Sequence, residues 1–143
     1  MTTGTPLARI FEEFQSVGEQ QRLMLLLDYA KRLPELPGAY RDSLQDMDEV
    51  VECQSPLFLA TDFDDAAEVA HIYFAAPPEA PTTRGFASIL QHGLSGQSYE
   101  AILGVKADVG SHLGLARVIT PLRLRAVNAM VGRISRSVRD HVG

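Results

Sequence analysis

The sequence predicts an α+β fold in which a small antiparallel sheet of about three strands is flanked by N-terminal and C-terminal helices. Three observations lead to this prediction. Apolar residues recur at helical spacing in the first 37 residues and again after residue 81. Between these regions, two segments are rich in β-branched and aromatic residues, as strands are. Helices followed by strands and then by helices are typical of an α+β layer architecture.

Two helices are expected in the N-terminal part of the chain. Residues 5–18 (TPLARIFEEFQSVG) begin with Thr5 and Pro6, which are suited to an N-cap and a first helical position. Residues 19–37 (EQQRLMLLLDYAKRLPELP) predict a second helix that is ended by its two prolines. This helix is apolar on most sides, so we expect it to lie deep in the core.

The middle of the chain predicts the sheet. Residues 55–63 (SPLFLATDF) and 67–76 (AEVAHIYFAA) are expected to form two antiparallel strands, joined by a turn at DFDD. Residues 47–52 (MDEVVE) are a plausible third strand. That strand would leave Cys53 at the tip of the loop that leads into the next strand.

Helices are expected again in the C-terminal part. Residues 82–96 carry one apolar stripe, and residues 98–105 form a short helix capped by Ser98. Residues 120–142 are the clearest helix in the chain, with Thr120 as its N-cap. Its expected buried stripe comprises Val127, Met130, Val131, Ile134 and Val138.

Charge and composition exclude some classes of function. The formal net charge is −5, which disfavours a nucleic-acid partner. Residues 42–68 hold many carboxylates and no lysine or arginine, whereas the last helix is rich in arginine. These could be two solvated faces of opposite sign, or they could steer a protein partner. With no signal peptide and no stretch of the roughly 20 apolar residues that a membrane helix needs, the expected location is cytoplasmic.

Cys53 is the only cysteine. An internal disulfide is therefore excluded, as is a metal site built mainly from thiolates of this chain. A lone cysteine is often a small core residue. Here, however, the polar neighbours Glu52, Gln54 and Ser55 interrupt the alternation expected of a core strand. Reactive groups are commonly carried by loops on a rigid scaffold, so a functional thiol is the favoured interpretation.

Simple chemistry limits what one thiol can do. The four histidines have no recognisable protease or transferase context, and a dithiol redox cycle needs a second cysteine. No phosphate-binding loop or dinucleotide pattern accompanies the thiol, so an independent enzyme is disfavoured. What remains is intermolecular exchange, in which the thiolate attacks sulfur on a partner and carries the product covalently.

Five segments in order resemble the SufE family. The Cys-Gln-Ser of VVECQSPLFL resembles the sulfur-acceptor loop of that family. The other segments are RLPELP at 32–37, TTRGFASIL at 82–90, LSGQSYEAIL at 94–103 and TPLRLRAVNAMVGRI at 120–134. The match spans nearly the whole chain, so the resemblance implies one SufE-like sulfur-acceptor domain over residues 1–143, with a fold similar to SufE and IscU.

The resemblance also implies a function. A pyridoxal-phosphate cysteine desulfurase would pass the outer sulfur of its persulfide to Cys53, and the sulfur would then reach an iron–sulfur scaffold. Gln54 and Ser55 would shape the acceptor loop. The chain itself would bind no cofactor, since the pyridoxal phosphate belongs to the desulfurase. It would act as a monomeric carrier and desulfurase activator with no independent turnover.

Two residues leave the details of this expectation open. Arg123 matches the basic residue that opens the last helix of the family; it could stabilise a thiolate or persulfide, or it could be a solvated arginine. Glu52 stands where the family often has glycine, and its carboxylate should raise the pKa of the thiol above about 8.5 unless something compensates. A loop that departs from the family pattern could be paired with a different sulfur donor, so a rhodanese-type sulfurtransferase is an alternative donor. A non-catalytic interaction module with an incidental cysteine is the remaining alternative, whereas one cysteine is too few for a cluster scaffold.

Overall fold

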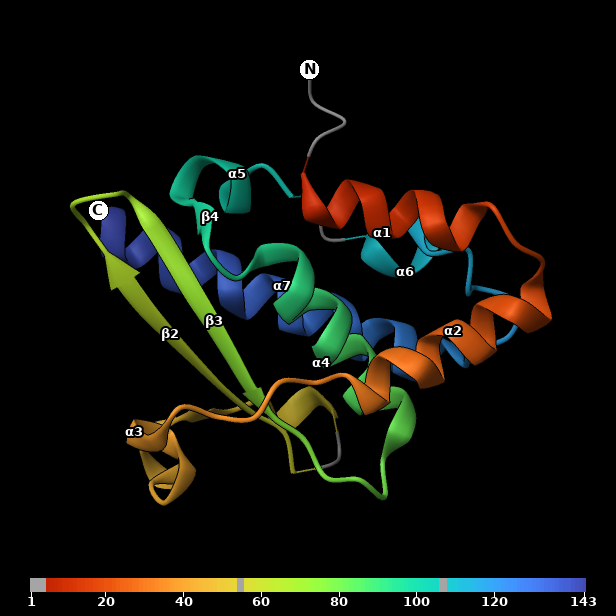
Figure 1. Ribbon diagram of the computed structural model, residues 1–143, viewed down its shortest axis with the longest axis horizontal. Coiled ribbons are helices and arrows are strands. Elements are labelled where there is room, and N and C mark those ends of the chain that lie inside the picture. The colour runs from red at the N-terminus through yellow and green to blue at the C-terminus, as the bar shows by residue number, and fades with distance from the viewer. Residues whose placement is uncertain (1–4, 54–55, 106–107) are drawn as a thin grey trace.

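The computed structural model describes residues 5–53, 56–105 and 108–143 (Figure 1). Its helices are α1 (Pro6–Gln15), α2 (Glu19–Lys31), α3 (Gly38–Arg41), α4 (Pro81–Leu94), α5 (Tyr99–Leu103), α6 (Val109–His112) and α7 (Pro121–Val142). Its strands are β1 (Asp48–Glu49), β2 (Phe58–Asp64), β3 (Val69–Ala75) and β4 (Gln97–Ser98). Two 3-10 turns flank β1, namely η1 (Leu44–Asp46) and η2 (Val51–Cys53). The α+β fold predicted from the sequence is confirmed.

The sheet is antiparallel with strand order β1-β2-β3-β4. Its centre is the β2–β3 hairpin, which is paired from Phe58 opposite Ala75 to Asp64 opposite Val69. The third strand expected over residues 47–52 pairs only at Asp48–Glu49, because the chain then curls into η2. Strand β4 was not expected, since two residues are too few to show an alternating pattern.

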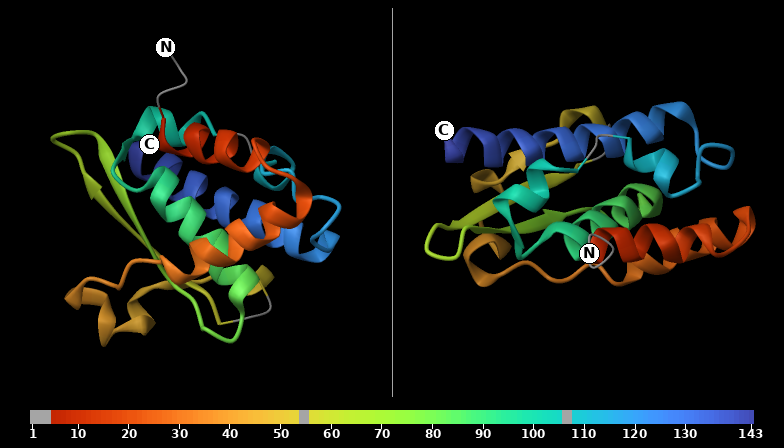
Figure 2. Two further views of the ribbon diagram at one scale, coloured as in Figure 1. Left: turned by 45° about the vertical axis from the view of Figure 1, so that its right-hand side comes forward. Right: turned by 90° about the horizontal axis from the view of Figure 1, so that it is seen from above.

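Helix α4 is the centre of the molecule. It lies between α2 on one side and α7 on the other, and it also contacts α1 and β3 (Figures 1 and 2). The sequence predicted one apolar stripe on this helix, but nearly every residue from Thr82 to Leu94 is buried, polar Ser88 and Gln91 included. The Gln91 side chain accepts a hydrogen bond from the Phe74 backbone N–H at 3.0 Å, which ties the helix to the sheet.

Small residues let the neighbouring helices approach α4 closely. A Cβ atom added at Gly85 would lie 2.5 Å from the Leu26 carbonyl oxygen of α2. A Cβ atom at Gly93 would lie 2.7 Å from Leu7 Cδ1 of α1. The glycine in the TTRGFASIL segment therefore marks a helix crossing, where a larger residue would push backbone against backbone.

Helix α2 is less buried than its composition predicted. Leu26, Tyr29 and Ala30 pack into the core, but Met24 is 69% exposed and Leu27 is 37% exposed. The expectation that this helix lies deep in the core is therefore wrong. The reason is its position at the outside of the molecule, where only one side of the helix meets α4 and α1 (Figure 2).

The helix starts follow the sequence signals. Thr5 accepts a hydrogen bond from the Ala8 N–H at 3.2 Å, Ser98 accepts one from Ala101 at 3.0 Å, and Thr120 accepts one from Arg123 at 3.4 Å. These side chains satisfy N–H groups that have no partner within the helix. The predicted stripe of α7 is fully confirmed, since all five of its residues are buried.

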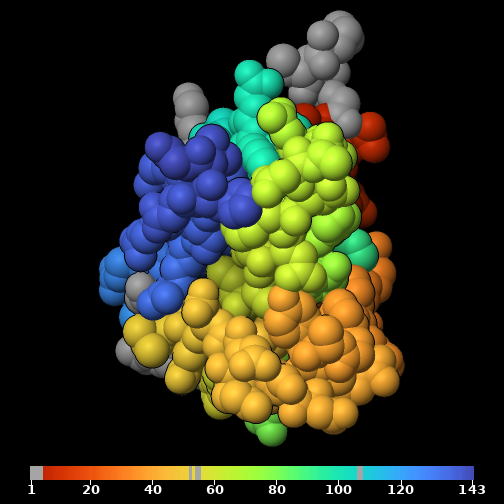
Figure 3. Space-filling view, turned by 90° about the vertical axis from the view of Figure 1, so that its left-hand side faces the viewer, coloured from red at the N-terminus to blue at the C-terminus, as the bar shows by residue number. Residues whose placement is uncertain are grey.

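The end of α7 lies beside the β2–β3 hairpin (Figure 3), and a polar and aromatic cluster fastens the two together. The Asp65 carboxylate accepts hydrogen bonds of 2.7 Å from the Tyr99 hydroxyl and from the His141 ring. The His141 ring stacks on Phe63 with centroids 3.8 Å apart. The bonds from His141 and Tyr99 hold the pKa of Asp65 below its usual range. Burial and the bond to Asp65 raise the pKa of Tyr99 to about 12.

Asp65→Asn is expected to lower the melting temperature at neutral pH. A carboxyl group whose folded pKa is depressed stabilises the fold above its unfolded pKa, and it loses that contribution as the pH falls through the folded value. The difference between wild type and variant should therefore shrink from about pH 4 downward. Thermal melts across this range measure it. Asp140→Asn, which removes a charge beside His141, is the control. A difference that is constant with pH would contradict the assigned role of Asp65.

Candidate functional site

The turn η2 carries Cys53. Just before it, the Val50 N–H donates to the Leu57 carbonyl at 2.8 Å, which ties this segment to the chain that leads into β2. The Cys53 N–H then donates back to the Val50 carbonyl at 3.1 Å and closes the turn. Val50 is fully buried and fixes the start of the turn to the hydrophobic core. The cysteine therefore sits on a short, hydrogen-bonded element between β1 and the chain that leads to β2.

The thiol of Cys53 is buried against α7. The residue is only 8% exposed, and its Sγ lies 4.0 Å from the Ala126 carbonyl oxygen. The sequence predicted that Cys53 lies at a loop tip. Cys53 does lie in the connection between β1 and β2, but its side chain turns inward and joins the apolar core. Burial limits the access of reagents to this side chain, so Cys53 is shielded in the resting protein.

Arg123 stands near this site along α7 but makes no side-chain contact that the described residues reveal. It lies three residues before Ala126, so the two share one side of the helix. Its backbone N–H bonds to the Thr120 cap, and its side chain is exposed. The described structure thus brings the Ala126 carbonyl to the thiol, which sequence analysis missed. No local sequence signal marks a backbone carbonyl as a partner.

Three residues singled out from the sequence lie wholly or partly outside the described structure. Gln54 and Ser55 are not among the described residues. For Glu52 only the backbone is described, as the middle residue of η2. The loop-shaping roles of these residues therefore stay predictions.

Histidine contacts are made away from the thiol. The His92 ring bonds to the Arg32 carbonyl at 3.1 Å, His112 stacks on Phe11, and His141 bonds to Asp65. Within the described ranges, no group of His, Cys, Asp and Glu side chains could hold a metal ion. Among the described residues, the candidate site is therefore a thiol packed beside a backbone carbonyl, with no metal-binding group of side chains.

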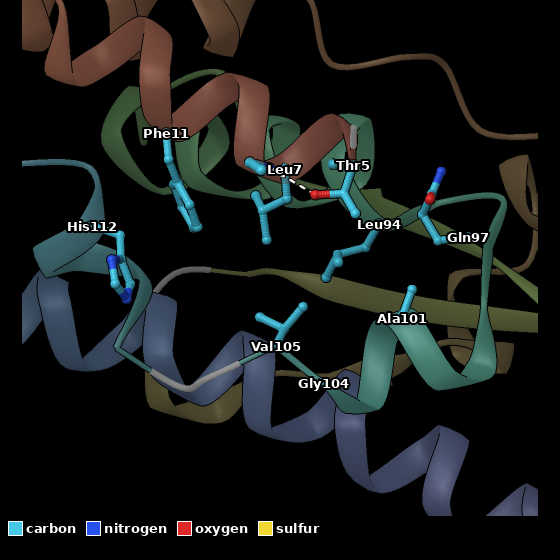
Figure 4. A pocket seen from close by; sticks show the side chains of 11 residues that line it. Thr5, Leu7, Phe11, Leu94, Gln97, Ala101, Gly104, Val105 and His112 are labelled. Atoms are coloured by element: carbon cyan, nitrogen blue, oxygen red, sulfur yellow. Dashed lines mark hydrogen bonds between the residues drawn. The ribbon is translucent and has the colours of Figure 1, made fainter. Parts of the chain in front are cut away.

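A cavity of about 550 Å³ lies at another place in the fold (Figure 4). It opens between α1, the end of α4 and the segment from α5 to α6, where Leu7, Phe11, Leu94 and Val105 face one another. Neither Cys53 nor any residue of α7 lines it. The thiol is therefore not part of this pocket.

Comparison with known proteins identifies the family of the chain. The family described as SufE, Fe-S metabolism associated domain, matches residues 8–138. The chain belongs to the SufE family. It is 50% identical over 135 residues to an uncharacterized SufE-like protein of Mycobacterium tuberculosis, a match that covers 94% of this chain and 92% of that protein. Association with iron–sulfur metabolism is thus the established context of this domain.

Two further comparisons extend the family relationship. The chain is 30% identical over 118 residues to SufE-like protein 1, chloroplastic/mitochondrial, of Arabidopsis thaliana, covering 82% of this chain and 30% of that protein. The solution structure of a hypothetical protein from Thermus thermophilus superimposes with a TM-score of 0.82 at 35% identity, covering 96% of this SufE family member and 97% of that chain. The fold expected from the resemblance is therefore confirmed. In the described parts of the chain, no helix is both long and apolar enough to cross a membrane.

Cys53 is expected to react slowly with iodoacetamide in the folded protein. Because the thiol is 8% exposed, alkylation must wait for η2 to open locally. We expect a rate at least about 100-fold below that of the protein unfolded in guanidinium at the same pH. Intact-mass time courses measure both rates, and small-molecule cysteine calibrates the reagent. A folded protein that reacts as fast as the unfolded chain would contradict the burial of the thiol.

Proposed function

We propose that this protein accepts persulfide sulfur from a cysteine desulfurase on Cys53 and relays it to iron–sulfur cluster assembly. The observation that carries the proposal is the placement of the chain's only thiol on η2, against α7, in a member of the SufE family. Burial supports a carrier role, since a persulfide held in this place would be shielded from water and from stray thiols. The pyridoxal phosphate of the reaction belongs to the donor.

The proposed transfer balances without an added oxidant or reductant. The Cys53 thiolate attacks the outer sulfur of the donor's cysteine persulfide. A sulfur–sulfur bond forms at Cys53 while the donor's sulfur–sulfur bond breaks, and its electron pair leaves with the donor cysteine as a thiolate. The proton released by Cys53 offsets the one that the departing thiolate takes up. The product is a Cys53 persulfide whose outer sulfur is ready for a second transfer.

Activation has to come with docking in this proposal. The resting thiol is buried against α7, so a donor has to open η2 before the two sulfur atoms can meet. Arg123, exposed in the first turn of α7, is proposed to stabilise the thiolate or persulfide once η2 moves outward. The carrier would thus be inert alone and reactive on its donor.

The test is sulfur loading of the purified protein. It is incubated with the cysteine desulfurase encoded in the same genome, pyridoxal phosphate and free cysteine, without reductant, and its intact mass is measured. The proposal expects a gain of one sulfur atom, removed by dithiothreitol, and a faster desulfurase turnover. A desulfurase that is neither bound nor stimulated, with no sulfur on the carrier, would overturn the proposed donor.

A parallel reaction tests whether the donor is a rhodanese-type sulfurtransferase and not a cysteine desulfurase. A rhodanese-type sulfurtransferase from the same genome, supplied with thiosulfate, replaces the desulfurase. Sulfur gained only in this reaction would assign the carrier to the rhodanese. Sulfur gained from neither donor would leave an interaction module with an incidental cysteine.

A further inference from the structure

The cavity of about 550 Å³ beside α1 has the size and the lining of a small-molecule site (Figure 4). Ligand pockets in proteins usually enclose about 300–1,000 Å³ and are lined mainly by apolar side chains. The side chains of Leu7, Leu94 and Val105 point into this cavity from three different segments of the chain. The cavity therefore offers a ligand an apolar interior that the proposed sulfur transfer does not use.

The cavity is elongated along α1. Thr5, Ala8 and Phe11 line it at intervals of three residues, so they lie close to one face of that helix and its cap. From Thr5 to Phe11 this face extends for about 9 Å at 1.5 Å per residue. Figure 4 shows His112 at one end of the cavity and Gln97 at the other, with apolar side chains between them. Its shape is thus an apolar trough whose described polar groups lie toward the ends.

Small residues keep the trough open. Ala8 on α1, Ala101 on α5 and Gly104 directly after α5 all line it. Protein interiors contain few voids larger than a water molecule, and longer aliphatic side chains at positions 8 and 101 would fill this one. Helix propensity does not oppose such a change, since leucine forms helices nearly as well as alanine. The stability of the fold therefore does not explain why the trough is open.

We propose that this trough binds the aliphatic chain of a small amphiphile, such as a medium-chain carboxylic acid, with the polar group of the ligand at one end. The lining is mainly aliphatic, and its two rings, Phe11 and His112, stack on one another with centroids 5.2 Å apart. A flexible chain can follow such a lining, and its burial supplies binding free energy in proportion to the apolar area removed from water. The inference is independent of the proposed function, since neither Cys53 nor α7 lines the trough.

Titration of the full chain with sodium octanoate, followed by ¹H–¹⁵N correlation NMR, tests the proposal. We expect saturable shifts at the backbone amides of Ala8, Ala101 and Val105, with a Kd of about 0.1–1 mM for a ligand of about ten non-hydrogen atoms. 1-Octanol should bind within about tenfold of octanoate, because the chain and not the head group is held. Acetate, which has the head group without the chain, should cause no saturable shift.

Variants that fill the trough separate this site from general apolar binding. Ala101→Leu fills it from α5 and Ala8→Leu fills it from α1, and each should raise the Kd for octanoate by at least about tenfold. Both variants should melt at or above the wild-type temperature, since the added methyl groups gain contacts. Ala39→Leu, an exposed position on α3 that does not line the trough, is the matched control, and its Kd should stay within about twofold of wild type.

Three results would overturn the proposal. The first is an absence of shifts with octanoate, or shifts centred on the exposed Met24 and Leu27 of α2. The second is octanoate binding that neither Ala101→Leu nor Ala8→Leu weakens. The third is tighter binding of 4-methylbenzoate, which has the same numbers of carbon and oxygen atoms as octanoate but a flat ring in place of the chain. Sulfur loading of Cys53 is measured separately from octanoate binding, so either proposal can fail without the other.

Discussion

Cys53→Ser is expected to fold and to dock on the donor, yet to accept no sulfur. A serine hydroxyl is not ionised near neutral pH and is a poor nucleophile toward sulfur, so the sulfur–sulfur exchange has no attacking group. The fold should be retained, because oxygen is smaller than sulfur and replaces it in the buried site without a steric clash. We expect a loss of about 1 kcal/mol in the free energy of unfolding.

Three measurements separate chemistry from docking in this variant. Intact mass should show no sulfur after incubation with the desulfurase, and the stimulation of turnover should be lost. The Kd for the desulfurase should stay within about threefold of wild type, since replacing a buried side chain leaves the surface unchanged. Sulfur carried by the variant would rule out Cys53 as the acceptor. A variant that replaces the wild-type gene without any cellular defect would favour the interaction module.

Gly85→Ala is expected to lower the free energy of unfolding, unlike a methyl group added at an open position of a helix. The new Cβ would lie 2.5 Å from the Leu26 carbonyl and 2.8 Å from Leu26 Cδ1, so α2 has to move away from α4. Overpacking of this kind costs about 1–3 kcal/mol, and here the obstacle is backbone rather than a flexible side chain. At about 2–4 °C per kcal/mol for a chain of this size, the melting temperature should fall by several degrees.

Gly132→Ala is the matched control on α7. Nothing lies within 4 Å of a Cβ added at Gly132. Alanine in a helix interior should therefore raise the free energy of unfolding, by about 0.5–1 kcal/mol. Urea unfolding of the two variants should give changes of opposite sign. A Gly85→Ala variant as stable as Gly132→Ala would contradict the close crossing of α2 and α4.

Features governed by neighbours along the chain were predictable from the sequence. The helix starts at Thr5, Ser98 and Thr120 depend on one side chain and an N–H three residues away. The β2–β3 hairpin and the buried stripe of α7 depend on periodicity, which is also local. The identity of Cys53 as the candidate acceptor came from its polar neighbours, its uniqueness and the resemblance to the SufE family. Apart from the uniqueness of Cys53 and the family resemblance, which draw on the whole chain, these signals lie within a few residues of the feature that they mark.

The sequence by itself determined the long helices, the β2–β3 hairpin and which side chain could carry sulfur. The tertiary structure decided that the thiol is buried against a carbonyl 73 residues away and that α4 rather than α2 is the central helix. It also decided that Arg84 donates to the Ala30 and Ala76 carbonyls and so joins two elements. The physical reason is that burial and charge proximity depend on residues far apart in the chain, which no local pattern records.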